Sequence, residues 1–119
     1  MAMVWKSKTR RINKVLLAGE TILVGQALCI RDTESTVKLA DSDAVGGALM
    51  PCIGFAGNGA SIGGPVEVVT EGLLSGVDTP AEGRSVFVSA TAGAVDQTGG
   101  TYQQLVGTAL TSTLMEVSV

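Results

Sequence analysis

The chain has 119 residues, enough for one domain with a modest core and too few for two. It contains no histidine, which excludes histidine-based acid–base catalysis, and its two cysteines fall short of the four ligands of a structural zinc site. The net charge is −3, but five Lys or Arg residues and no acid fall within the first fourteen positions, while the remainder carries three basic against eleven acidic residues. The composition therefore predicts a basic N-terminal segment on an acidic body.

Residues 1–13 are predicted to form an extended N-terminal arm, and residues 14–119 a single β domain. Trp5 is the only tryptophan and lies directly before the run of basic residues. A terminal segment is often a disordered tail, but a lone Trp beside cations is also typical of a segment that becomes ordered on a partner. We favour the second interpretation. The candidate partner-binding residues are Trp5, Lys6, Lys8, Arg10, Arg11 and Lys14.

Short apolar runs separated by glycine and polar residues predict a series of short strands from residue 15 to residue 56. Residues 31–35 are predicted to be a polar hairpin loop. Within residues 41–48, a cap followed by Gly46 and Gly47 predicts at most one helical turn. Asn58 and Gly59 then predict a tight type I′ hairpin turn, because both of its central residues need positive φ.

Residues 64–77 contain the clearest strand pattern in the chain. Val66, Val68 and Thr70 share one parity, and Glu67, Val69 and Glu71 the other, which predicts one apolar and one mainly acidic face. Gly72 interrupts the run, and a strand–turn–strand unit centred on this glycine is the simplest prediction. The two glutamates are expected to be surface charges, not a catalytic pair.

The C-terminal third repeats the pattern of short apolar runs bounded by glycine, with strands expected at 84–90, 93–96, 102–110 and 113–119. Sixteen glycines and only four Trp, Tyr or Phe residues indicate many turns around a core of aliphatic side chains. The predicted fold class is therefore all-β, a small Gly-rich antiparallel domain with at most one short helix and an extended N-terminal arm.

No catalytic, cofactor-binding or metal-binding motif is found. Residues 57–63 miss the dinucleotide-binding glycine spacing and lead to Pro65 instead of a helix. Cys29 and Cys52 are expected to be buried reduced thiols, with a disulfide as the alternative. The acidic body and the scarcity of aromatic residues favour a protein partner over nucleic acid. The N-terminus lacks an apolar signal segment, so we expect synthesis in the cytoplasm and no membrane partner. The missing cofactor and nucleotide motifs predict no small-molecule substrate.

Glycine and valine spacings over most of the chain resemble those of a known group of proteins. The motifs are Ala18-Gly19-Glu20, Gly25, Ile53-Gly54-Phe55-Ala56, Gly64-x-Val66-x-Val68, Glu71-Gly72, Gly83-x-x-Val86-Phe87-Val88, Gly93-x-Val95 and Val106-Gly107-Thr108-Ala109. In this pattern the chain resembles the small head-decoration, or capsid cement, proteins of tailed bacteriophages.

This resemblance implies a β-barrel or β-tulip body, a homotrimer and a position on the exterior of the virion. Such proteins clamp the major capsid protein of the expanded capsid and stabilise it against internal DNA pressure, without enzymatic activity or cofactor. The resemblance also implies that the N-terminal arm adds a strand to the capsid, so deletion of residues 1–14 is expected to abolish attachment and spare the body. The alternatives are another virion surface component, such as a tail or receptor-binding module, and a lipoyl-like carrier domain. The carrier is less supported because Lys38 falls within a predicted strand and not at a hairpin tip.

Overall fold

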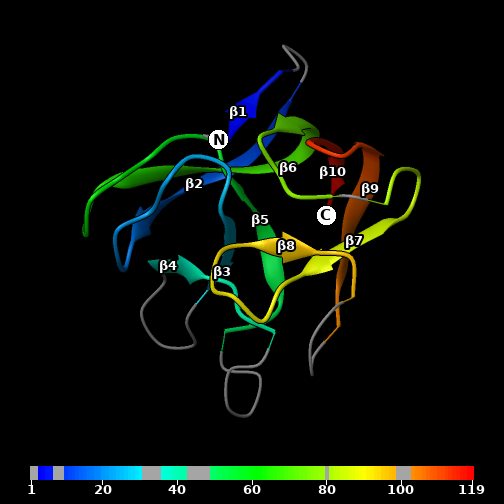
Figure 1. Ribbon diagram of the computed structural model, residues 1–119. Helices are drawn as coiled ribbons and strands as arrows, with labels where there is room; N and C mark the ends of the chain where they lie inside the picture. The colour runs from blue at the N-terminus through cyan, green and yellow to red at the C-terminus, as the bar shows by residue number, and fades with distance from the viewer. Residues whose placement is uncertain (1–2, 7–9, 31–35, 43–48, 80, 99–102) are drawn as a thin grey trace.

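The computed structural model describes residues 3–6, 10–30, 36–42, 49–79, 81–98 and 103–119 (Figure 1). Within these ranges the protein is all-β, and its strands join in one continuous sheet. The strands are β1 (Val4–Trp5), β2 (Arg11–Ala18), β3 (Ala27–Ile30), β4 (Thr36–Leu39), β5 (Cys52–Ala56), β6 (Pro65–Ser75), β7 (Ser85–Val88), β8 (Val95–Asp96), β9 (Leu105–Thr111) and β10 (Leu114–Ser118).

Five of these strands close into a barrel in the order β2-β4-β3-β5-β6, because β6 pairs again with β2. All the pairs are antiparallel except β2 with β4, which is parallel. Alternate residues of the strands point inward, as a two-residue side-chain period requires. The buried interior consists of Ala18, Ile22, Leu28, Val37, Ala56, Val66 and Val68. The prediction of an all-β barrel is confirmed.

Strand β6 belongs to both halves of the molecule. Its first part pairs with β5 and β2 inside the barrel, and its last part, from Glu71 to Ser75, pairs with β10. The predicted turn at Gly72 is therefore wrong, because the strand continues through this residue. Gly72 has a φ of 151°, and a Cβ added to it would lie 3.0 Å from the Cβ of Arg10 and 3.2 Å from the ring of Trp5. This glycine allows the close approach of the N-terminal segment instead of reversing the chain.

The second half of the sheet continues from β6 through β10, β9 and β7 to β8 (Figure 1). Its inner face packs on the outer face of the barrel and buries Phe55, Leu74, Met115 and the apolar residues around them. Strand β3 is covered on both sides as a result, since Leu28 points into the barrel whereas Ala27 and Cys29 face this second core. The central strands therefore carry a nearly continuous apolar run.

Two pairs of hydrogen bonds connect the second half of the sheet to the barrel. Gly93 donates its N–H to the carbonyl of Ala40 (2.8 Å) and accepts a hydrogen bond from the N–H of Ala27 (2.9 Å). The side chain of Gln104 accepts from the backbone N–H of Cys52 (2.6 Å) and donates to its carbonyl (2.8 Å). Both connections satisfy backbone groups that the sheet ladder leaves unpaired at this junction.

The predicted tight turn at Asn58 and Gly59 is also wrong. These residues begin an eight-residue connection between β5 and β6, and Gly59 does not have a positive φ. Asn58 acts through its side chain instead, donating to the carbonyl of Pro65 and accepting from the N–H of Glu67. Because the Asn58 side chain bonds to the backbone at the start of β6, it connects the two strands across a loop that is longer than a tight turn. The loop expected at 31–35 and most of the helical turn expected at 41–48 lie outside the described residues.

Candidate partner-binding site

The described part of the N-terminal segment lies along a single edge of β6. In β1, Val4 and Trp5 pair with Ser75 and Leu74, and the N–H of Lys6 donates to the carbonyl of Leu73 (2.8 Å). Strand β2 then continues on the same edge, starting at Arg11 opposite Glu71. The first strand of the barrel therefore begins three residues before the predicted boundary between arm and body.

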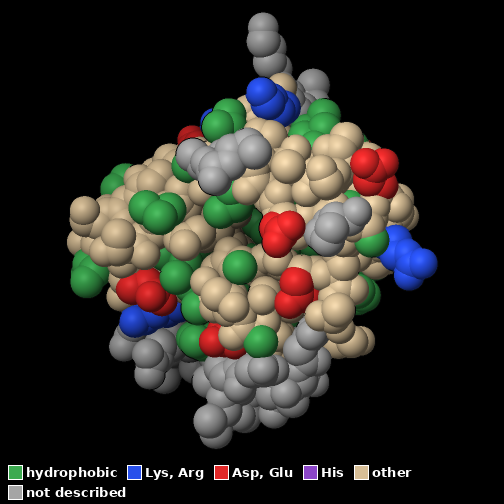
Figure 2. Space-filling view, in the orientation of Figure 1, with side chains coloured by type: hydrophobic (Ala, Val, Ile, Leu, Met, Phe, Trp, Pro, Cys, Tyr) green, Lys and Arg blue, Asp and Glu red, His purple; other side chains and the backbone are tan. Residues whose placement is uncertain are grey.

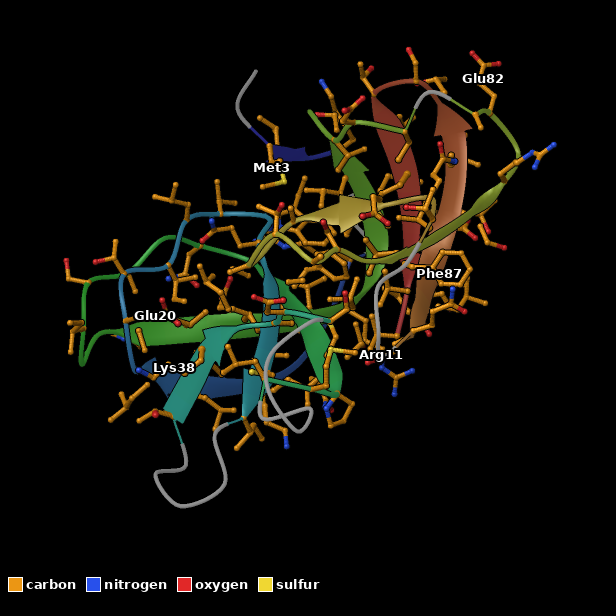
Figure 3. All side chains as sticks on the ribbon, turned by 60° about the horizontal axis from the view of Figure 1, so that its bottom comes forward. Met3, Arg11, Glu20, Lys38, Glu82 and Phe87 are labelled. Carbon is orange, nitrogen blue, oxygen red and sulfur yellow. The ribbon has the colours of Figure 1, made fainter. Side chains whose placement is uncertain are left out.

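Trp5 is fastened to the body of its own chain. Its side chain is half-buried against the second core, and its indole N–H donates to the carbonyl of Ala56 (3.0 Å). Met3, just before β1, covers Gly25 and packs against the second core (Figure 3). This geometry makes Trp5 part of the packing that holds β1 on β6.

The basic residues of the segment lie on the same edge but point outward. Lys6, Arg11 and Lys14 are exposed, and the guanidinium of Arg11 extends away from the ribbon in Figure 3. Arg10 forms an ion pair with Glu67 (3.6 Å), and both side chains are about one-third exposed. Of the six candidate residues, the structure thus brings five to one edge, and Lys8 lies outside the described residues.

Three exposed apolar side chains lie on the same strand as Arg11 and Lys14, and they are not among the candidate residues predicted from the sequence. Ile12, Val15 and Leu17 of β2 are 42%, 57% and 52% exposed. Val15 and Leu17 lie opposite Glu67 and Pro65 of β6 on the outer surface of the barrel. The run of four apolar residues from 15 to 18 hid this division, because a continuous apolar run does not reveal which parity faces the core.

The face seen in Figure 2 has a different character. Acidic side chains are spread across its middle, and the few Lys and Arg side chains lie at its margin. Basic residues are concentrated along β2 and the residues before it, but Glu67 and Glu71 of β6 lie next to them, opposite Val15 and Arg11. Strand β2 itself carries Arg11 and Lys14 and no acidic residue.

The remaining polar groups that the sequence singled out lie elsewhere. Lys38 is in the middle of β4, half-buried, and pairs with Cys29 of β3. Cys29 and Cys52 are reduced and buried, and burial raises the pKa of the Cys52 thiol from 9.0 to about 11. Glu71 is exposed, as predicted.

The described residues offer neither a metal-binding cluster nor a membrane-spanning helix. They contain no group of three or more His, Cys, Asp or Glu side chains placed to hold a metal ion. They also contain no helix with the length and hydropathy to cross a bilayer. The chain matches no protein-family model, and no curated protein is significantly similar to it in sequence.

Proposed function

We propose that this protein is a non-enzymatic structural component of a virion, which binds the outside of an expanded phage capsid as a trimeric clamp. The observation that carries this proposal is the combination of a closed barrel with an exposed basic and apolar strand, β2, on its surface. A clamp needs a stable body and a surface that another protein can cover, and it needs no catalytic group. The spacing resemblance to capsid decoration proteins supplies the partner.

The electrostatic arrangement supports attachment to an acidic protein surface. Lys6, Arg11 and Lys14 are exposed on one edge, so they remain available to a partner. The ion pair of Arg10 with Glu67 reduces the contribution of Arg10, since its charge is already partly balanced. We therefore assign recognition of the capsid mainly to β2, and stabilisation of the body to Trp5.

The proposal is tested by incubating the protein with expanded capsids of the phage that carries its gene and sedimenting the particles. Binding at three-fold or quasi-three-fold positions, seen by electron microscopy, is the expected result. Density at the tail would establish the alternative, a tail or receptor-binding component, and no density on the particle would refute a virion role. The mass in solution distinguishes a preformed trimer of three 12.0 kDa chains from assembly on the capsid.

Deletion of residues 1–14 is no longer a selective test of attachment. The deletion would remove β1, the packed Trp5 and the first four residues of β2, and so would disturb the body as well. Charge substitutions at Arg11 and Lys14 change the exposed surface and leave these backbone pairings in place. Reduced capsid binding by a folded variant of this kind is the expected outcome.

A further inference from the structure

We propose that the outer edge of β2, from Arg11 to Leu16, is a docking site for one extended, acidic strand of a partner protein. The assignment of that partner as the capsid protein rests on the proposed function. The existence of the docking edge does not rest on the proposed function, because it follows from the pairing and the side chains of β2.

Among the residues that the structure describes, the backbone of β2 is paired on one side only over most of its length. Arg11, Ile12 and residues 14–17 pair with β6, with register shifts on both sides of Ile12. Strand β4 joins the other side only at Leu17 and Ala18. Among the described residues, none pairs with residues 11–16 on that second side. A strand directs its N–H and C=O groups alternately to its two sides, so this edge presents donors and acceptors that an added strand can use.

The side chains of this edge define the chemistry of the added strand. Ile12 and Val15 are exposed apolar residues, and Arg11 and Lys14 are exposed cations beside them. Strand β2 itself carries no carboxylate, and in the register with β6 Arg11 lies opposite Glu71 whereas Lys14 lies opposite Val68. A partner strand that mixes Glu or Asp with β-branched residues would give opposite-charge and apolar cross-strand pairs along the whole edge.

The same charges argue against a second copy of this chain as the occupant. If two β2 edges paired, they would bring Arg11 and Lys14 of both chains together, and like charges that face each other across a sheet are destabilising. Exposed cations are a common protection of edge strands against self-association. An acidic strand turns this repulsion into attraction, so the edge selects its partner by charge.

This mode of binding leaves the N-terminal segment in place. Trp5 stays hydrogen-bonded to Ala56, and β1 stays paired with Leu74 and Ser75, because the docking edge faces away from β6. The partner strand adds to a preformed barrel. The ordering cost of binding therefore falls mainly on the partner.

The test is an NMR titration of the full-length protein with the synthetic peptide acetyl-Thr-Glu-Val-Glu-Val-Glu-Val-Thr-amide. We expect amide shifts centred on residues 11–16 and slowed hydrogen exchange there. A peptide with Lys in place of Glu should bind with an affinity at least about tenfold lower. Peptides N-methylated on one or the other set of alternate amides separate the two edges of the ligand, and only one set should abolish binding, since only one edge would pair with β2.

The protein variants use matched charge changes. The double variant R11E/K14E should reverse the peptide preference, and R11Q/K14Q should remove it without adding repulsion from Glu71. The control Arg84→Glu makes the same kind of charge change at an exposed residue just before β7 and should leave the preference unchanged. The dispersion of the spectrum reports whether each variant is folded, and the N-methylated peptides test the edge without any variant.

The inference is overturned by shifts that centre elsewhere, by equal affinity for the two peptides, or by no shift up to millimolar peptide. Self-association of the protein through β2 in place of peptide binding would overturn it too. If the protein binds capsids but not the peptide, the docking edge is refuted and the proposed function is not. If it binds the peptide but not capsids, the proposed function is refuted and the docking edge is not.

Discussion

The substitution Trp5→Ala tests whether the N-terminal segment is part of the folded body. A large aromatic side chain buries roughly 150–250 Å², and Trp5 is only half-buried. About 100 Å² at about 25 cal/mol per Å² corresponds to about 2.5 kcal/mol, and the lost hydrogen bond adds about 1 kcal/mol. The carbonyl of Ala56 keeps its second donor, the N–H of Gly25 at 2.8 Å, so no buried acceptor is left unpaired. We expect a loss of about 3.5 kcal/mol in the free energy of unfolding, or about 12 °C in Tm.

Urea unfolding followed by far-ultraviolet circular dichroism measures this loss, because the variant has no tryptophan to report by fluorescence. Trp5→Phe is the matched control, since it keeps most of the apolar area and loses only the indole donor, at a cost of about 1 kcal/mol. Lys6→Gln, at an exposed side chain, should change the free energy by less than about 0.5 kcal/mol. In the unaltered protein, tryptophan emission should shift to longer wavelength on unfolding. The docking of β1 would be refuted if Trp5→Ala and the unaltered protein unfolded at the same urea concentration and the tryptophan of the folded, unaltered protein emitted like one in solvent.

Three further substitutions probe other contacts. Gly107→Ala should cost about 3 kcal/mol in a thermal melt, because its Cβ would collide with the backbone carbonyl of Glu116 on β10; an unchanged Tm would contradict this. Gln104→Leu removes both hydrogen bonds to the backbone of Cys52 and should cost about 2 kcal/mol, whereas exposed Gln103→Leu should be nearly neutral. Burial raises the pKa of the Cys52 thiol from 9.0 to about 11, so stability should be complete below pH 9 and fall by about 3 kcal/mol as the pH rises through 11. Urea titrations across this range should show a smaller fall for Cys52→Ala, and equal falls would argue against the raised pKa.

Alternation in the sequence predicted most of the faces of β6, but Val69, which has the parity of Glu67 and Glu71, is fully buried opposite Phe55. Val66 and Val68 point into the barrel and Glu71 is exposed, as their parities indicate. The all-β class followed from the same logic, since short apolar runs bounded by glycine are too brief for helices. Local patterns succeed where the decisive interaction is between neighbours in the chain.

Gly72 and Asn58 show where local patterns fail. A glycine within a strand signals either a turn or the close approach of another segment, and only the position of Arg10 and Trp5 decides between them. Asn58 bonds to Pro65 and Glu67 through its side chain, an interaction that the Asn-Gly pair itself does not reveal. The docked position of Trp5 depends in the same way on Ala56, fifty-one residues away.

The N-terminal residues that the sequence grouped as one binding arm divide by geometry into two sets. Trp5 has its side chain directed at the body and its N–H satisfied there, so a partner could use it only by displacing it and losing those contacts. Arg11 and Lys14 are already exposed to solvent, and no described strand pairs with the second side of β2 at these residues, so a partner could approach them without displacing a described strand. The two sets therefore make opposite predictions. Trp5→Phe should affect stability more than partner binding, and R11Q/K14Q should affect binding more than stability. A single variant that lowered both to the same degree would show that the segment binds by leaving β6.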